Sequence, residues 1–290
     1  MSYLVPAQRP VEDAIDDGYD AKPLQYVYGG WYVFRSRPAA FVSLAFVFLL
    51  ANEALSRLFL APSSSGSLRT ELFYTLPLQM ARLGLFHGME ALMLAGIGVM
   101  AWQQLDNRPL SPMAFFKDWR SVGLVLACAA AITLVAWTPI MFITSLPFVG
   151  GALAARVTLR GVIVLTLLGV ILFVYVMVSY VFAYFVLIDR KDGMWKALEG
   201  SRRVVQRHWA KIAGLMFLVM ALNVEMYCLL GSALEIMSPG LGFHWFCMTE
   251  IAGGQGAFVL IVFTALGRAI SGCVLAVAYA DIYGTPTTVE

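Results

Sequence analysis

A basic segment between two long apolar runs is the feature that most constrains this chain. Residues 189–211 read DRKDGMWKALEGSRRVVQRHWAK and contain seven of the twenty Lys and Arg residues. Apolar runs of about 20 residues cross a bilayer as helices, and loops rich in Lys and Arg stay on its cytoplasmic side. The segment therefore predicts an integral membrane protein and the direction of its insertion.

The segment also has the periodicity of an amphipathic helix from Met194 to about His208, with Asp192 as its expected N-cap. One face collects Met194, Ala197, Leu198, Ser201, Val204, Val205 and Trp209, and the other collects Lys196, Glu199, Arg203, Gln206 and Arg207, with Arg202 at the edge. We expect the helix to lie in the headgroup plane with its apolar face in the membrane. Its cations then meet anionic lipid through the candidate contacts Lys196, Arg202, Arg203, Arg207 and Lys211. The alternative is a helix that packs on a partner protein.

Composition supports a polytopic membrane protein. Of the 290 residues, 60% are hydrophobic and 13% are charged, whereas a soluble domain has roughly a quarter charged residues. We predict an all-α transmembrane bundle, with a flexible tail over 1–23, a six-span membrane domain over 24–284 and a short tail over 285–290. The predicted spans run from about 38 to 60, 83 to 102, 122 to 142, 161 to 188, 212 to 234 and 257 to 283.

Two further aromatic segments, 24–37 and 115–120, are predicted as interfacial helices, and Thr138-Pro139 predicts a kink or the end of the third span. With the helix at 194–208, they suggest a threefold repeat of one interfacial helix and two spans. The alternative is that any interfacial helix looks like this. Fourteen Lys and Arg residues precede the first span or lie in the loops between spans two and three and between spans four and five. This bias predicts that both termini are cytoplasmic.

A resemblance to a known group rests on the segment VLIDRKDGMWKALEGSRRVVQRHWAKIAGLMFLV, chiefly on Ala197, Leu198, Ser201 and Trp209, and on GGWYVFRSRPAAF near the start. The chain resembles six-span bacterial membrane proteins that include the membrane domain attached to some glycerophosphodiester phosphodiesterases. Most of the group has no known function. The resemblance implies a fold and a location in a bacterial inner membrane, but not a reaction.

Ionisable and amide side chains occur at matching depths in the predicted spans. Counting 1.5 Å per residue puts the three carboxylates roughly 10–14 Å below the outer boundary and Arg268 about 16 Å deep. The candidate cluster consists of Glu53, Glu90, Glu225, Arg268, His87, Asn52 and Asn223. One interpretation is a polar cavity for a cation, a proton or a lipid headgroup. The other is a structural one, with Arg268 paired to Glu225, Glu90 or Glu53 and the amides joining helices.

No pattern predicts a catalytic residue, a metal site or a cofactor. The spacing of metal ligands occurs in His87 with Glu90, but the second such pair that a site of this kind needs is missing. It also occurs in His244 with Cys247 and Glu250, where the alternative is an interfacial segment anchored by Phe243, Trp245 and Phe246. We expect a non-enzymatic structural, assembly or accessory protein, whose partners are the lipid bilayer and a protein in a membrane complex, without nucleic acid. The alternatives are a small transporter or channel that uses the carboxylates and, last, an enzyme acting on lipid.

Overall fold

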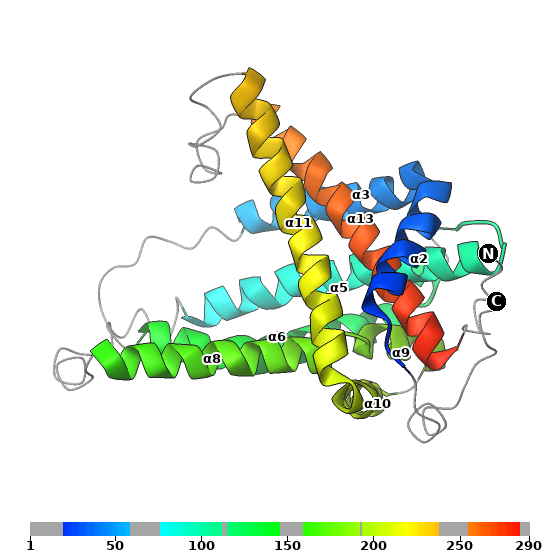
Figure 1. Ribbon diagram of the computed structural model, residues 1–290. Coiled ribbons are helices and arrows are strands. Elements are labelled where there is room, and N and C mark those ends of the chain that lie inside the picture. The colour runs from blue at the N-terminus through cyan, green and yellow to red at the C-terminus, as the bar shows by residue number, and fades with distance from the viewer. Residues whose placement is uncertain are drawn as a thin grey trace. The chain divides into compact units, whose positions relative to one another are not determined.

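The computed structural model describes residues 20–58, 76–111, 115–145, 159–191, 193–237 and 255–284. All regular structure in these ranges is helical, so the predicted all-α fold is confirmed. The elements are α2 (Pro23–Ser36), α3 (Pro38–Leu58), α5 (Leu76–Leu105), the 3-10 turn η2 (Phe115–Lys117), α6 (Trp119–Ser145), α8 (Leu159–Ser179), α9 (Ala183–Arg190), α10 (Met194–Arg207), α11 (Trp209–Met237) and α13 (Gln255–Tyr283) (Figure 1).

Five stretches of described helix are long and apolar enough to cross a membrane. They are Pro38–Leu55, Pro77–Leu105, Trp119–Thr138, Thr166–Arg190 and Ile261–Tyr283. These match five of the six predicted spans. The remaining one falls in α11, whose side chains are described as far as Val224, and the stretch Trp209–Val224 is apolar but shorter. The six-span count and the position of the termini remain predictions.

The fourth predicted span differs from the expected single helix. It consists of α8 and α9, separated by a turn over residues 180–182. The turn forms because the Ala183 N–H donates to the Tyr180 carbonyl at 3.0 Å instead of reaching back to Ser179. An α-helix needs the bond to the residue four positions earlier. The helical ladder is therefore interrupted at Ser179.

One smaller prediction is wrong. The interfacial helix expected over 115–120 is the three-residue turn η2, and α6 begins directly afterwards at Trp119. At Thr138-Pro139 the helix does not end, because α6 continues to Ser145 as one element, and the alternative of a kink stays a prediction. Both helices predicted at 24–37 and 194–208 are present, as α2 and α10.

Local chemistry explains several helix ends. Pro23 begins α2, where its missing N–H costs no helical bond. After α5, Asn107 has φ of 57°, and the Arg108 N–H bonds the Gln103 carbonyl at 2.8 Å, which is the Schellman arrangement. After α9, Lys191 has φ of 51° and its N–H bonds the Leu187 carbonyl at 3.2 Å. This left-handed residue separates α9 from α10.

The chain forms two compact units. The first contains residues 1–51, 93–119 and 207–290, and the second contains residues 52–92 and 120–206. Within the first unit, α13 contacts α2, α11 and the second half of α5. A side chain at Gly30 of α2 would meet the Val274 backbone at 2.5 Å, so the absence of a Cβ lets α2 and α13 approach closely. Trp102 of α5 donates to the Ala276 carbonyl at 3.2 Å.

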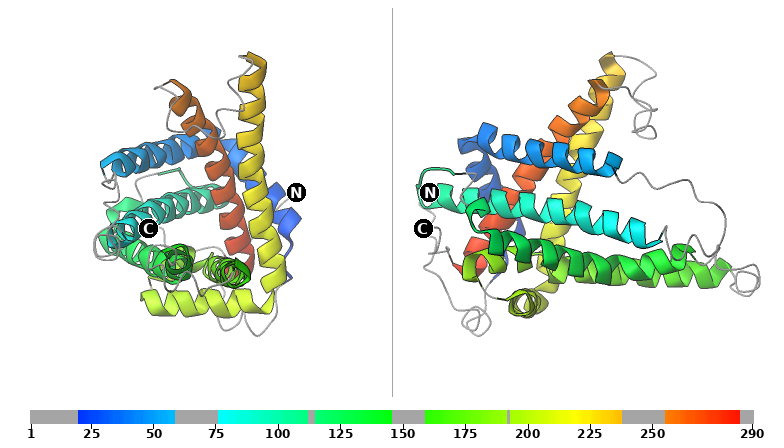
Figure 2. Two further views of the ribbon diagram at one scale, coloured as in Figure 1. Left: turned by 90° about the vertical axis from the view of Figure 1, so that its left-hand side faces the viewer. Right: turned by 180° about the vertical axis from the view of Figure 1, so that it is seen from behind.

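The second unit contains α6, α8, α9, α10 and the first half of α5. In Figure 1, α8 lies in the plane of the picture while α10 is seen from its end, and the turned view in Figure 2 shows the reverse. Helix α10 therefore runs across the direction of α8 and does not extend it. The αL residue Lys191 and the short connection to Met194 make this change of direction.

Candidate functional site

The apolar face of α10 is covered by protein. Ala197, Leu198, Ser201, Val204 and Val205 are all buried. This is the face predicted from the sequence, but the expectation that it enters the membrane is wrong for these five side chains, because protein already covers them. The surface that α10 offers to its surroundings is the opposite one. The predicted cap Asp192 lies outside the described residues.

A hydroxyl joins α10 to the interruption between α8 and α9. Ser201 Oγ donates to the Ser179 carbonyl oxygen at 2.9 Å, and both residues are buried, with exposed fractions of 0% and 2%. This carbonyl is the one that the Ala183 N–H no longer reaches. A buried carbonyl without a donor is costly, so Ser201 replaces the missing helical partner. The sequence placed Ser201 on the buried face but gave no sign of this contact.

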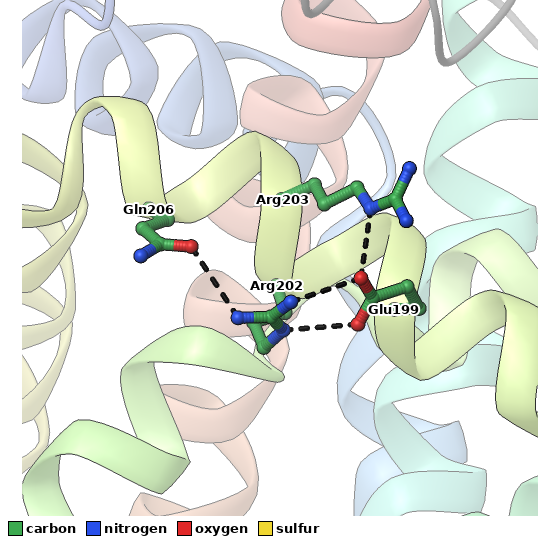
Figure 3. Close-up of polar contacts among 4 residues, drawn as sticks. All are labelled: Glu199, Arg202, Arg203 and Gln206. Carbon is green, nitrogen blue, oxygen red and sulfur yellow. Dashed lines mark hydrogen bonds and ion pairs between the residues drawn. The ribbon is translucent and has the colours of Figure 1, made fainter.

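The face of α10 opposite its buried face carries the Glu199 carboxylate, which two guanidinium groups bind (Figure 3). Arg202 donates to Glu199 through Nε and Nη2, at 2.9 Å each, and a third bond of 3.4 Å joins its Nη1 to Gln206. Arg203 donates through Nε to Glu199 Oε1 at 2.7 Å. Charge-assisted bonds of this kind are shorter and stronger than neutral ones. The hydrogen bonds from Arg202 and Arg203 lower the pKa of Glu199 to about 2.

The five candidate lipid contacts are therefore not equivalent. A carboxylate engages Arg202 through two nitrogens, and Lys211 forms an ion pair with Asp20. The hydrogen bond from Lys211 also lowers the pKa of Asp20. Lys196 and Arg207 are exposed, and Arg203 keeps 62% of its side chain exposed beside Glu199. These five cations were predicted from the sequence, whereas the pairing of two of them with Glu199 and Asp20 in this way was not.

In the second unit, His87 of α5 joins a cluster with α6 and α8. The Trp137 indole Nε1 donates to His87 Nε2 at 3.2 Å, and His87 Nδ1 lies 3.3 Å from Glu90 Oε2. The His87 and Trp137 rings stack with centroids 6.0 Å apart, and Phe173 of α8 meets Trp137 edge-on at 5.1 Å. An indole N–H is only a donor, so Nε2 must be the unprotonated nitrogen. With Nε2 accepting, a neutral imidazole carries its proton on Nδ1, which faces the Glu90 carboxylate.

In the first unit, Asn223 of α11 joins α13. Its Nδ2 donates to Ser271 Oγ at 2.8 Å and to the Val219 carbonyl at 2.7 Å, and Ser271 in turn donates to the Gly267 carbonyl at 2.7 Å. A side chain at Gly267 would lie 2.8 Å from Asn223 Oδ1. The absence of a side chain at Gly267 therefore lets α11 approach α13 closely at this position. Amides and hydroxyls in such contacts join membrane helices.

The remaining members of the predicted cluster lie in different places. Asn52 is buried and Glu53 is exposed, both in the second unit, whereas Arg268 is half-buried in the first. The side chain of Glu225 is not among those described. The pairing of Arg268 with a carboxylate, and a single site made of all seven residues, therefore stay predictions. The contacts that the structure does give are His87 with Glu90 and Asn223 with Ser271.

Metal binding was the other chemistry suggested by spacing. Among the described residues no group of three or more His, Cys, Asp or Glu is arranged to hold a metal ion. The segment with His244, Cys247 and Glu250 lies outside the described residues.

Sequence reasoning missed Trp137 and Ser271, whose roles depend on which helices are neighbours. A weak signal existed for Ser271, which follows Gly267 by one helical turn.

Comparisons with protein-family models, with curated proteins and with solved structures found no match. The resemblance to the six-span group therefore remains an expectation.

Proposed function

We propose that this chain is a multi-pass protein of a bacterial inner membrane with a structural, assembly or accessory role and no catalytic activity. In this proposal six spans cross the bilayer and both termini are cytoplasmic. Helix α10 runs across α8, which supports its placement along the cytoplasmic surface if α8 spans the membrane. The five apolar helices supply the membrane embedding.

One observation carries the structural role. Polar side chains in the apolar helices bond to side chains of neighbouring helices, as Asn223 does with Ser271 and His87 with Trp137. Groups used in this way hold spans together. A transport pathway needs polar groups that exchange their partners for a passing ion or substrate. The observed contacts favour fixed joints between helices.

The test compares stability with ion flux for the full chain. Asn223→Leu and Ser271→Ala should each lower the unfolding temperature in mild detergent, with a coupling of about 0.6 kcal/mol in the double-mutant cycle. Vesicles containing the wild-type protein should pass protons, Na⁺ and K⁺ no faster than empty vesicles. Cross-linking in native membranes should give one stoichiometric protein partner. A saturable flux that Glu90→Gln abolishes would replace this proposal with the transporter.

A further inference from the structure

We propose that Lys196, Arg203 and Arg207 form one stripe that binds the phosphate groups of anionic lipids. Their spacing of seven and eleven residues places the three side chains within about 40° of one another around the α10 axis. All three are exposed. The stripe lies opposite the buried apolar face, so it is the part of α10 that can meet the headgroups. The inference requires only that the protein sits in a membrane.

Two carboxylates, Glu199 and Asp20, decide which cations belong to the stripe. Glu199 takes two nitrogens of Arg202, and Asp20 pairs with Lys211. Arg203 meets Glu199 through Nε alone in Figure 3, where no dashed line joins its two terminal amino groups to that carboxylate. Terminal guanidinium nitrogens make the forked bonds that phosphate accepts. Arg203 can therefore bind a phosphate without releasing Glu199.

A tryptophan beside the stripe favours lipid over a protein surface. Trp195 directly precedes Lys196 and is 78% exposed. Tryptophan is enriched at the headgroup level of membranes, where its ring is partly apolar and its N–H stays hydrated. Cations near the surface of the anionic cytoplasmic leaflet each contribute to the attraction. An exposed Trp and three aligned cations on a helix that runs across a spanning helix fit that interface.

The experiment uses the full chain in a neutral detergent and measures lipid binding by native mass spectrometry. Phosphatidylglycerol, phosphatidylcholine and inorganic phosphate are each titrated. The wild type should prefer phosphatidylglycerol. The double variant R203Q/R207Q should bind it about 25-fold more weakly, from roughly a fivefold loss per cation. The matched double variant R202Q/K211Q removes two cations that carboxylates already hold and should lose much less.

Because the stripe is exposed and an exposed ion pair such as Arg203 with Glu199 is worth little, R203Q/R207Q should stay close to the wild-type unfolding temperature in phosphatidylcholine. If it does not, Lys196→Gln alone replaces it, with a loss of about fivefold expected. Equal losses in both double variants overturn the stripe, since net charge alone then attracts lipid. Displacement of phosphatidylglycerol by millimolar inorganic phosphate identifies free phosphate as the ligand and overturns the lipid. The lipid proposal is also overturned if the wild type shows no lipid preference and the R203Q/R207Q variant loses a bound acidic protein. None of these results bears on the accessory role.

Discussion

The Ser201 hydroxyl occupies the place of a helical N–H at the Ser179 carbonyl, 2.9 Å away. This one hydrogen bond supplies a donor to the carbonyl at the interruption between α8 and α9, and it also anchors α10 against that interruption. The interruption and the packing of α10 are therefore one structural feature. A serine fits because its hydroxyl can rotate toward the acceptor. It is also small enough for a face on which Ala197 and Val205 are fully covered.

Replacing Ser201 with Ala should destabilise the protein by about 1–3 kcal/mol, because the Ser179 carbonyl stays buried without this donor. Thermal unfolding in mild detergent measures the loss. Ser43→Ala is the matched control, since Ser43 also donates to a carbonyl, that of Ala40 at 3.0 Å, but at an exposed position. Its effect should be within about 0.5 kcal/mol. Equal effects from the two variants would contradict the role given to Ser201.

Removing one phenolic hydroxyl should loosen the contact between α2 and α13. Tyr26 is buried and donates to Asp281 Oδ2 at 2.8 Å. Tyr26→Phe keeps the ring and loses the bond, so we expect a loss of about 1 kcal/mol in unfolding free energy. Tyr28→Phe, at a position that is 72% exposed, should change nothing measurable. Protection of α2 amides from hydrogen exchange gives a second readout, and unchanged protection in Tyr26→Phe would speak against the contact.

The tautomer of His87 can be observed directly. The Trp137 hydrogen bond predicts that His87 carries its proton on Nδ1 and has a bare Nε2. Nitrogen-15 NMR on histidine-labelled protein should show this, with the resonance assigned by His87→Gln. In Trp137→Phe the Nε2 signal should move toward that of a nitrogen that accepts no hydrogen bond. Trp119→Phe, at an exposed position on the same helix, should leave it in place. A wild-type spectrum with the proton on Nε2 would refute the assignment.

The two arginines that lower the pKa of Glu199 also give a pH dependence. The ordinary pKa of this carboxyl is 4.5 and the folded value is about 2. A lowered pKa means that stability is gained above 4.5 and is lost as the pH falls from 4.5 toward 2. The difference in unfolding temperature between wild type and Glu199→Gln should therefore be constant from pH 8 to about pH 5 and shrink below about 4.5. The difference should be small because Glu199 is partly exposed. A difference that grows toward low pH would be inconsistent with this pairing.

Sequence patterns predicted the helices well because long apolar runs and the period of 3.6 residues act locally. Five apolar runs became helices long enough to cross a membrane, and the buried face of α10 contains the residues that its periodicity indicated. The turn at 180–182 was missed because VSYVFAYF contains no Gly or Pro. Conversely, Pro139 does not end α6. In both places the surroundings outweigh the local preference.

The candidate site was less predictable for a related reason. Counting along each span gave the depth of a residue but not the direction of its side chain. His87 and Glu90 were therefore placed together correctly, whereas Trp137, which donates to His87, could not be found. The cations of α10 were visible in the sequence. Glu199 pairs with Arg202 three residues away on the same helix, a contact that the spacing alone makes possible. Asp20 pairs with Lys211 from about 190 positions away, and this contact depends on the tertiary structure.

The contact between α2 and α13 also bears on how the chain is made. Tyr26 and Asp281 are 255 positions apart, and the glycine face of α2 is shaped to the Val274 region of α13. During synthesis α2 leaves the ribosome before α13 exists, so the part of its surface that α13 covers stays uncovered until the residues between them have been made. Proteases and chaperones that survey nascent membrane proteins therefore meet an uncovered glycine face on α2 in any chain that still lacks α13.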